Sequence, residues 1–517
     1  MKTKLIKTRL LFIALAATTL IFSSCSDGNG TADDKIYTNP TPSTTKPESS
    51  LNVGVMLQGF DWTSNKKSRG SSTDWYKIIS NNADEIKNTF EYVWFPPVSD
   101  SGSENGYLPR ELNNLGESSG FAFGTNGTQY GSKQNLISSI KAISPAKAIA
   151  DIVINHRVGT KNWGTFSNPT WADDYYSICS NDEGFTTPGS DMYGSSKKGA
   201  EDTGESYGSA RDLDHTNWDV QNGIVSWMND VLKRAGFAGW RYDFVKGYGG
   251  KYVGYYNAQT NAAFSVGEYW PTNGFSASNP TAWKNEIEKW ISSTGDSIKT
   301  NDDNWENLTE AKIAERDEPG TKSRAFDFVL KGILNTVFGN KGIGIANKNY
   351  NLLASPAALY KSAPAYAVTF IDNHDTGSTQ ALWYLDPNDV GTAYAFILTH
   401  PGYPCVAWQH YFSASESDDS RNSSQYFGDK TVPGTTLTYK QLIFKLISLR
   451  ADAGITEISQ VNVSSKTSAS RYLAEVSGAK KTLLVCIGSD YSAKESEWKS
   501  EIQGTDFHIW SKSNTMQ

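Results

Sequence analysis

The sequence predicts an α/β fold, a (β/α)8 TIM barrel with one inserted domain and a small C-terminal antiparallel β-sheet domain. Short apolar runs of strand-like composition alternate with helix-like segments along most of the 517-residue chain, and this alternation is typical of a parallel sheet. Four of the runs end in a carboxylate or a histidine. Functional side chains in such a barrel project from the C-terminal ends of its strands, so these four ends are expected to meet.

The central run covers residues 239–247, Gly-Trp-Arg-Tyr-Asp-Phe-Val-Lys-Gly. Strand side chains alternate between two faces, which puts Arg241 and Asp243 on the same face. Taken alone, this pair is explained equally well by a structural ion pair. The other three runs end at Asn155-His156, at Glu268-Tyr269-Trp270 and at Asp372-Asn373-His374-Asp375. Four ends of this kind in one chain favour a shared site over four separate ion pairs.

These four motifs, in this order, resemble those of the α-amylase superfamily, glycoside hydrolase family 13. Residues 239–248 are most similar to the plant-type α-amylases, and the similarity extends over residues 51–517. The resemblance implies a retaining enzyme that cleaves internal α-1,4 bonds of starch or glycogen. It implies that Asp243 is the nucleophile, Glu268 the proton donor and Asp375 a third carboxylate that stabilises the transition state.

The chemistry of retention agrees with these assignments. Retaining hydrolysis needs two carboxyl groups about 5–5.5 Å apart, which neighbouring strands at a barrel mouth can supply. Arg241 is expected to keep Asp243 ionised. The neighbouring carboxylates are expected to raise the pKa of Glu268, so that Glu268 starts the reaction protonated.

Several polar and aromatic side chains beside these carboxylates are candidates for sugar binding. The resemblance places Tyr107, in the Gly-Tyr-Leu-Pro loop 106–109, against the sugar at the scissile bond, although such a tyrosine can also serve turn packing. His156 and His374 can hydrogen-bond sugar hydroxyls, with a structural role as the alternative for each. Lys246 could reach a sugar on the leaving-group side. The candidate substrate contacts are Tyr107, His156, Arg241, Lys246, Trp270 and His374.

The resemblance also implies a bound Ca²⁺ ion. The corresponding ligand positions are Asn155, Asp212 and the Gly247 carbonyl, with Asp202 as a further candidate. Calcium is bound by carboxylate, amide and carbonyl oxygens, which these residues provide. Asp202 is followed two residues later by Gly204. The plant enzymes carry another Asp shortly after the corresponding glycine, where this chain has Glu-Ser-Tyr at 205–207. The full ligand set is therefore left open.

The N-terminus is typical of an exported protein. Positive charges precede an apolar stretch that ends at Phe22, which predicts a signal peptide over residues 1–24. Residues 21–25 resemble a bacterial lipoprotein cleavage box, so Cys25 is expected to be lipidated and to anchor the protein to a bacterial membrane. An ordinary signal peptide with an incidental cysteine is the alternative. Residues 25–50 are rich in Gly, Ser, Thr and Pro, which predicts a disordered linker.

The remaining chain divides into three predicted domains. The barrel covers residues 51–156 and 211–451, domain B with the calcium site covers 157–210, and the C-terminal domain covers 452–517. The predicted barrel strands are 53–57, 92–95, 149–154, 239–247, 263–267, 367–371 and 404–408. The predicted helices include 134–143, 218–235 and 442–450, and the C-terminal strands are 472–476, 482–486 and 507–510.

Composition narrows the possible partners. The net charge is −7 and no basic tract follows the N-terminus, so a nucleic-acid partner is not expected. We expect a monomer. Cys179, Cys405 and Cys486 are far apart in sequence and are expected to be buried thiols rather than a disulfide framework.

Two other functions fit the same motifs. One is a related enzyme that prefers maltooligosaccharides, pullulan or α-1,6 branches, because domain B and the loops determine that preference. The other is an inactive glucan-binding protein. Inactive relatives typically lack one of the three carboxylates, and this chain has all of them.

Overall fold

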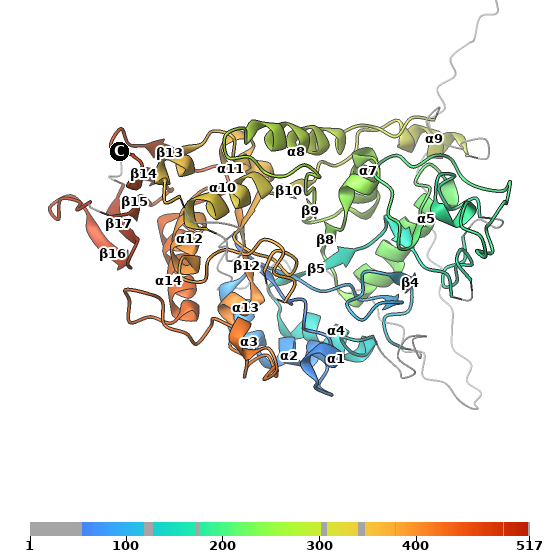
Figure 1. Ribbon diagram of the computed structural model, residues 1–517, viewed down its shortest axis with the longest axis horizontal. Coiled ribbons are helices and arrows are strands. Elements are labelled where there is room, and N and C mark those ends of the chain that lie inside the picture. Colours follow the sequence, from blue (N-terminus) through green and yellow to red (C-terminus); the bar gives the residue numbers. More distant parts are fainter. Residues whose placement is uncertain are drawn as a thin grey trace, which may run out of the picture. The chain divides into compact units, whose positions relative to one another are not determined.

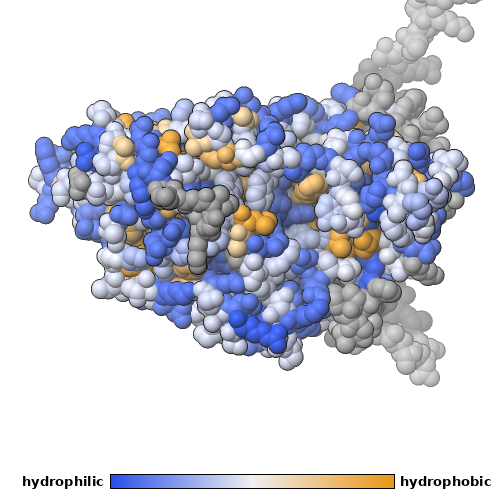
Figure 2. Space-filling view, in the orientation of Figure 1, coloured by the Kyte–Doolittle hydropathy of each residue, from blue (hydrophilic) through white to orange (hydrophobic). Residues whose placement is uncertain are grey.

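The computed structural model describes residues 54–117, 128–160, 162–171, 175–300, 308–339, 347–377, 379–489 and 491–514. The predicted signal peptide, the lipidated Cys25 and the linker lie outside the described residues. Within the described part of the chain, no helix is both long enough and apolar enough to cross a bilayer. Figure 2 shows apolar side chains on the visible face as small patches separated by hydrophilic ones.

A closed barrel of parallel strands forms the centre of the described structure (Figure 1). Each strand pairs with its neighbours in chain order, and the last strand closes onto the first. The predicted (β/α)8 barrel is therefore confirmed. Its strands are β1 (Met56–Gln58), β2 (Tyr92–Trp94), β5 (Lys147–Ile152), β8 (Gly239–Tyr242), β9 (Ser265–Gly267), β10 (Arg324–Phe326), β11 (Ala367–Phe370) and β12 (Tyr403–Ala407).

The sequence analysis did not identify β10. This strand has three residues and begins with Arg324, so it lacks the longer apolar run that marks the other strands. Arg324 instead forms an ion pair with Glu457 and lies over the ring of Phe264. A short strand with a charged first residue gives little period-two signal.

Helices lie around the strands in Figure 1. The longer helices bury apolar side chains on one face; α8, for example, buries Trp283, Ile287 and Ile291 at helical spacing. The helices are α1 (Lys66–Arg69), α2 (Trp75–Asn81), α3 (Ala83–Thr89), α4 (Lys133–Ala142), α5 (Trp218–Ser226), α6 (Lys233–Ala235), α7 (Gly250–Thr260), α8 (Thr281–Ser293), α9 (Glu310–Arg316), α10 (Phe328–Phe338), α11 (Leu359–Ser362), α12 (Val390–Ile397), α13 (Trp408–Tyr411) and α14 (Tyr439–Ala453).

The helix predicted over 218–235 consists of three consecutive segments. A π-helical segment, η2 (Trp227–Leu232), separates α5 from α6. The helix ends at Gly236, whose φ of 114° is accessible to glycine at little cost. Its apolar side chains Val220, Ile224 and Met228 are fully buried.

Two short antiparallel pairs support the loops at the C-terminal mouth of the barrel. Strands β6 (His156–Arg157) and β7 (Arg211–Asp212) pair and so join the two ends of the long excursion after β5. Within the described part of that excursion, the structure has one 3-10 turn, η1 (Glu183–Phe185), and otherwise irregular backbone. Strands β3 (Asp100–Ser101) and β4 (Pro109–Glu111) form a second pair, and Tyr107 lies in their connection.

The C-terminal residues form a five-stranded antiparallel sheet beside α12 and α14, which confirms the predicted sheet. Its order is β13 (Gln460–Val463), β14 (Arg471–Ser477), β15 (Lys481–Gly488), β17 (Phe507–Ser513) and β16 (Lys499–Gln503). The three predicted strands are the inner ones. The two missed strands lie at the edges, where side chains are mostly exposed and polar, so their apolar pattern is weak. As predicted, Cys179, Cys405 and Cys486 are buried.

Candidate functional site

Side chains from the C-terminal ends of the barrel strands meet around the guanidinium of Arg241. Strand register pairs Asp151 of β5 directly with Arg241 of β8. Arg241 Nη1 lies 2.9 Å from Asp151 Oδ1 and 2.7 Å from Asp243 Oδ1. Its Nη2 lies 2.6 Å from Glu268 Oε2. One buried cation therefore holds three carboxyl groups from three adjacent strands.

The backbone turns sharply after Asp243. Phe244 has φ 42° and ψ 47°, a left-handed conformation that is uncommon for a residue with a side chain of this size. A 3-10 turn, η3 (Val245–Gly247), follows. The strand thus stops at Asp243 and leaves its carboxylate beside Arg241 at the mouth of the barrel.

A tight turn presents the third predicted carboxylate, Asp375. The side-chain oxygen of Asn373 accepts hydrogen bonds from the backbone N–H groups of Asp375 and Thr376, at 3.0 and 2.8 Å. Beneath this turn, the buried ammonium of Lys331 lies 2.6 Å from Asp372 Oδ1. The turn is therefore anchored from below, and Asp375 remains partly exposed at the site.

Tyr107 and His374 form a hydrogen-bonded, stacked pair beside these carboxylates. The Tyr107 hydroxyl donates to Asp151 Oδ2 at 2.9 Å and lies 2.7 Å from His374 Nε2. Gln58 Nε2 lies 2.8 Å from His374 Nδ1 and can only donate there, so the proton of His374 sits on Nε2. Burial lowers the pKa of His374 well below its ordinary value, and the charge of Arg241 lowers it further. His374 is therefore neutral and donates through Nε2.

His156 is held from two sides. Its Nε2 lies 2.9 Å from the backbone carbonyl of Tyr107, and its ring stacks on Tyr207 with 3.9 Å between centroids. Burial lowers the pKa of His156, so its ring is neutral at pH 7. The structure thus brings His156, Tyr107 and His374 into one chain of contacts.

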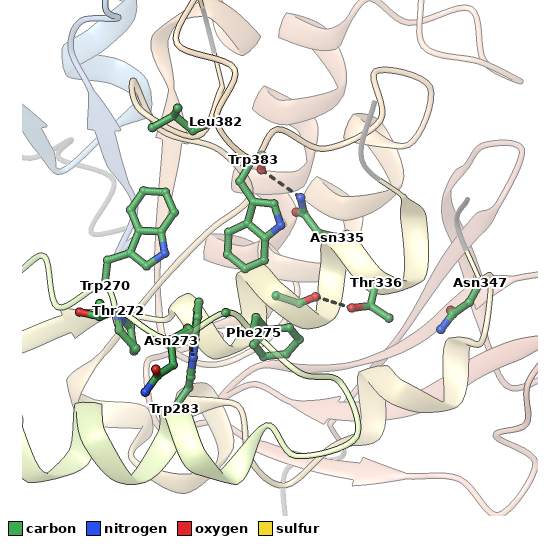
Figure 3. Close-up of a pocket in the computed structure, with 13 residues that line it drawn as sticks. Trp270, Thr272, Asn273, Phe275, Trp283, Asn335, Thr336, Asn347, Leu382 and Trp383 are labelled. Carbon is green, nitrogen blue, oxygen red and sulfur yellow. Dashed lines mark hydrogen bonds between the residues drawn. The ribbon is translucent and has the colours of Figure 1, made fainter. Parts of the chain in front are cut away.

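Lys246 and Trp270 lie where the site extends beyond β8 and β9. Lys246 Nζ is 2.8 Å from Thr272 Oγ1 and 3.2 Å from Glu205 Oε2. The ring of Trp270 stacks on Phe328 and faces Trp383, and it borders a cavity of about 670 Å³ (Figure 3). Both predicted residues therefore line the same side of the site.

Burial and neighbouring charges raise the pKa values of two carboxyl groups of the site, Glu268 and Asp151. The pKa of Glu268 is raised well above its ordinary value, first by burial and then by the charges of Asp375, Asp243 and Asp151, while Arg241 opposes the shift. The sequence analysis attributed this rise to like charge, and the structure corrects that cause, because burial contributes more. Burial also raises the pKa of Asp151 to about 7.

Glu268 is arranged to keep and to deliver a proton. Its Oε2 contacts Arg241, whereas its Oε1 is buried without a hydrogen-bond partner among the described residues. A raised pKa lets a carboxyl group keep its proton to higher pH, so Glu268 is suited to donate from Oε1, the oxygen that Arg241 does not contact.

The four candidate calcium ligands gather beside this site. Asn155 Nδ2 lies 3.3 Å from Asp212 Oδ1, and the amide oxygen of Asn155 lies against Gly247, where a Cβ would collide with it. Burial raises the pKa of Asp212 to about 7, and the charge of Asp202 is among the further causes. Asp202 Oδ2 is buried and has no hydrogen-bond partner in the described part of the chain.

This donor set fits calcium. In the described residues no three His, Cys, Asp or Glu side chains are close enough to hold a metal by themselves. Calcium also accepts amide and backbone carbonyl oxygens, which Asn155 and Gly247 supply. Glu205, at the point where the chain departs from the plant pattern, turns toward Lys246, while Ser206 Oγ and the Tyr207 N–H hydrogen-bond Asp212.

Comparison with known proteins identifies the family. The protein-family model described as "Alpha amylase, catalytic domain" matches residues 65–409 of this chain. The chain belongs to the alpha-amylase family. The protein is thus a glycoside hydrolase that acts on α-glucans.

Relatives with similar sequences include plant and bacterial enzymes. The "Probable alpha-amylase 2" of Arabidopsis thaliana is 29% identical over 470 residues, which cover 89% of this chain and 94% of that protein. The "Alpha-amylase 3, chloroplastic" of the same plant is 28% identical over 491 residues, 90% of this chain and 46% of that protein. A "Glucan 1,4-alpha-maltotetraohydrolase" of Stutzerimonas stutzeri is 26% identical over 460 residues, 84% of this chain and 68% of that protein.

Solved structures share the fold of this alpha-amylase family member. The cyclomaltodextrin glucanotransferase CldA superposes with a TM-score of 0.58 at 16% identity, over 91% of this chain and all of that one. An α-amylase from Geobacillus thermoleovorans, solved with acarbose, gives 0.55 at 14% identity, over 91% of this chain and 98% of that one.

The sequence analysis missed several side chains of this amylase-type site. Asp151 is the foremost, because it contacts Arg241 and Tyr107 and also accepts from Trp94 Nε1 at 3.0 Å. A lone carboxylate inside an otherwise apolar strand was the signal that could have found it. Trp62 stacks parallel to Tyr107, with centroids 6.1 Å apart, but it lies in a loop whose sequence carries no motif.

Replacing Asp151 by Asn should slow the enzyme and shift its pH dependence. The amide cannot accept from Arg241, Tyr107 and Trp94 together, so the loss in kcat/KM should be about a hundredfold or more. The charge of Asp151 also helps to raise the pKa of Glu268, so the alkaline limb of the kcat/KM profile should move to lower pH. The measurement is kcat/KM against pH.

Asp452→Asn, the same change at an exposed surface ion pair, is the matched control and should leave the profile in place. If the alkaline limb of the kcat/KM profile stays in place in Asp151→Asn, the charge of Asp151 does not raise the pKa of Glu268.

Proposed function

We propose that this enzyme is a retaining α-amylase that cleaves internal α-1,4 bonds of starch- or glycogen-type glucans. The main support is that Asp243 and Glu268 contact the two Nη atoms of the Arg241 guanidinium. Sharing one guanidinium favours the short carboxyl separation of retaining enzymes, about 5–5.5 Å, over the wider spacing of inverting ones.

In the first step, the carboxylate of Asp243 attacks the anomeric carbon and the bond from that carbon to the leaving oxygen breaks. Glu268 gives its proton to the leaving oxygen, which departs as a free hydroxyl. The sugar is now an ester of Asp243, with its anomeric configuration inverted. Arg241 Nη1 donates a hydrogen bond to Asp243 Oδ1, which orients this carboxylate.

In the second step, ionised Glu268 takes a proton from water, and the water oxygen attacks the anomeric carbon. The ester bond to Asp243 breaks, and the second inversion restores the original α configuration. Asp375, whose charge reaches Glu268, is the third carboxylate and stabilises the positive charge that develops in both transition states. His374 donates from Nε2 to the Tyr107 hydroxyl and so holds Tyr107 in place, and Tyr107 and Trp62 offer ring faces for stacking.

Internal attack requires room for glucan on both sides of the scissile bond. The site continues past Glu268 to Trp270 and the cavity beyond it, which gives space for sugars on the leaving-group side. This space lies on one of the two sides that an internally bound glucan must occupy.

The anomer of the first product tests this mechanism. NMR of fresh digests of amylose should show the α-anomer before mutarotation, and pullulan should be cut much more slowly than amylose. Asp243→Asn and Glu268→Gln should each lower kcat by about a thousandfold or more while the protein stays folded. A β-anomer formed first would contradict the proposed roles of the two carboxyls.

We also propose that Asn155, Asp202, Asp212 and the Gly247 carbonyl hold a calcium ion that joins the excursion after β5 to the barrel. When bound, the ion would neutralise the charges of Asp202 and Asp212. Gly204 supports this arrangement, since it packs directly on the backbone at Lys246 and Gly247.

Removing calcium should lower the melting temperature. A ligand that binds only the folded state stabilises it by mass action, so excess chelator should lower Tm by about 5 °C or more. Asp202→Asn should lose most of this response, whereas Asp191→Asn, an exposed change in the same excursion, should keep it. If Tm is the same with and without chelator, the proposed calcium site is wrong.

We propose further that the protein is exported and anchored to a bacterial membrane through a lipidated Cys25. Stable anchoring requires more than one acyl chain, as bacterial lipoproteins carry. Wild-type protein should partition with membranes, and Cys25→Ala should release or misprocess it. Cys486→Ala, which alters a buried thiol, is the control and should remain in the membrane fraction. Wild-type protein found wholly in the soluble fraction would contradict the anchor.

A further inference from the structure

A second cavity, of about 480 Å³, lies on the outside of the barrel, and none of its described lining residues belongs to the catalytic site. It lies between the helix formed by α5 and η2 and two loops, one that follows β4 and one in the excursion after β5. In Figure 1, α5 lies at the end of the molecule away from the C-terminal sheet. The lining includes Trp171, Asp219, Asn222, Ser226, Trp227 and Asp230.

Two tryptophans form the buried wall of this cavity. Trp171 is 8% exposed and Trp227 is 3% exposed. In the part of the chain that the structure describes, neither buried indole N–H has a hydrogen-bond partner. Trp171 Nε1 lies over Gly223, another lining residue, where any Cβ would collide with it. A buried donor without a partner costs free energy, so an oxygen of a ligand at this wall would be bound favourably.

The ring of Trp171 is held in place by Arg157. The guanidinium carbon of Arg157 lies 4.4 Å from the centre of this ring. The same guanidinium donates to three backbone carbonyls, those of Arg110, Ser167 and Pro169, at 2.6, 2.9 and 3.2 Å. A ring that is already fixed in the free protein binds a ligand at low entropic cost.

The helix supplies the polar rim of the cavity. Asp219, Asn222, Ser226 and Asp230 are exposed, on a different face from the buried apolar side chains of the same helix. Asp230 also pairs with Arg234 at 3.2 Å. The π-helical segment η2 begins at Trp227, and such segments are rare and frequently lie at functional sites.

The chemistry of the lining favours a sugar over a metal ion or an apolar ligand. Asp219 and Asp230 lie about 16 Å apart along a helix that rises 1.5 Å per residue, too far to share one metal ion. Carboxyl, amide and hydroxyl groups at the rim suit the hydroxyls of a sugar, and tryptophan rings suit its apolar face. The volume is within the range of small-ligand pockets, about 300–1,000 Å³.

We propose that this cavity is a second glucan-binding site, which holds glucosyl residues of an α-glucan outside the catalytic cleft and does not cut them. The inference goes beyond the proposed hydrolysis, because it concerns how the enzyme stays on a polymer. A glucan held at this site has a high effective concentration at the cleft. Polymers should therefore bind more tightly than substrates that occupy the cleft alone.

The test blocks the cavity from its rim. Ser226→Phe places a large side chain at an exposed helix position and leaves both tryptophans in place. This variant should raise KM for glycogen about fivefold at unchanged kcat. Its kcat/KM on 4-nitrophenyl α-maltotrioside, which is too short to occupy both sites, should stay that of the wild type. Ser292→Phe, the same change at an exposed serine of α8, is the control and should alter neither substrate.

A binding measurement separates this site from the proposed hydrolysis. In Glu268→Gln protein, retardation in native gels that contain glycogen reports binding without turnover. Adding Ser226→Phe should weaken this retardation, and adding Ser292→Phe should not. Retardation and glycogen KM that both stay unchanged in Ser226→Phe, or an equal loss of kcat/KM on glycogen and on the nitrophenyl substrate, would overturn the second site.

Discussion

The site depends on one buried cation that is shared by more carboxyl groups than it can neutralise. Arg241 contacts Asp151, Asp243 and Glu268, and Asp375 lies close enough for its charge to act on Glu268. Several ionised carboxylates cannot coexist out of water around a single positive charge. Proton retention on Glu268 therefore follows from the composition of the site, and that retained proton is what an acid catalyst needs.

The register of the barrel strands and one turn produce this arrangement. Parallel register puts Asp151 beside Arg241, and the left-handed turn at Phe244 stops β8 where Asp243 can meet the guanidinium. The charge of Arg241 is in turn what makes a buried cluster of acids tolerable, because removing it would leave unpaired carboxylates inside the protein.

Much of the fold was predictable because strand ends in a barrel carry polar residues that stand out against apolar runs. Strand β10 and the two edge strands of the C-terminal sheet were missed, since short or exposed strands carry little pattern. Asp151 was overlooked because one carboxylate inside a strand has no motif of its own. The cavity beside Trp270 was not predicted beyond Trp270 itself, because its lining residues are far apart in sequence and come together only in the folded barrel.

The central claim is that the folded site keeps Glu268 protonated at neutral pH. Carbon-13 NMR of protein labelled at the glutamate carboxyls, with Glu268→Gln to assign the signal, measures this directly. The account predicts that Glu268 titrates well above the ordinary glutamate value of about 4.3 and remains protonated at pH 7. A Glu268 signal that titrates near the ordinary value and is fully ionised at pH 7 would contradict it.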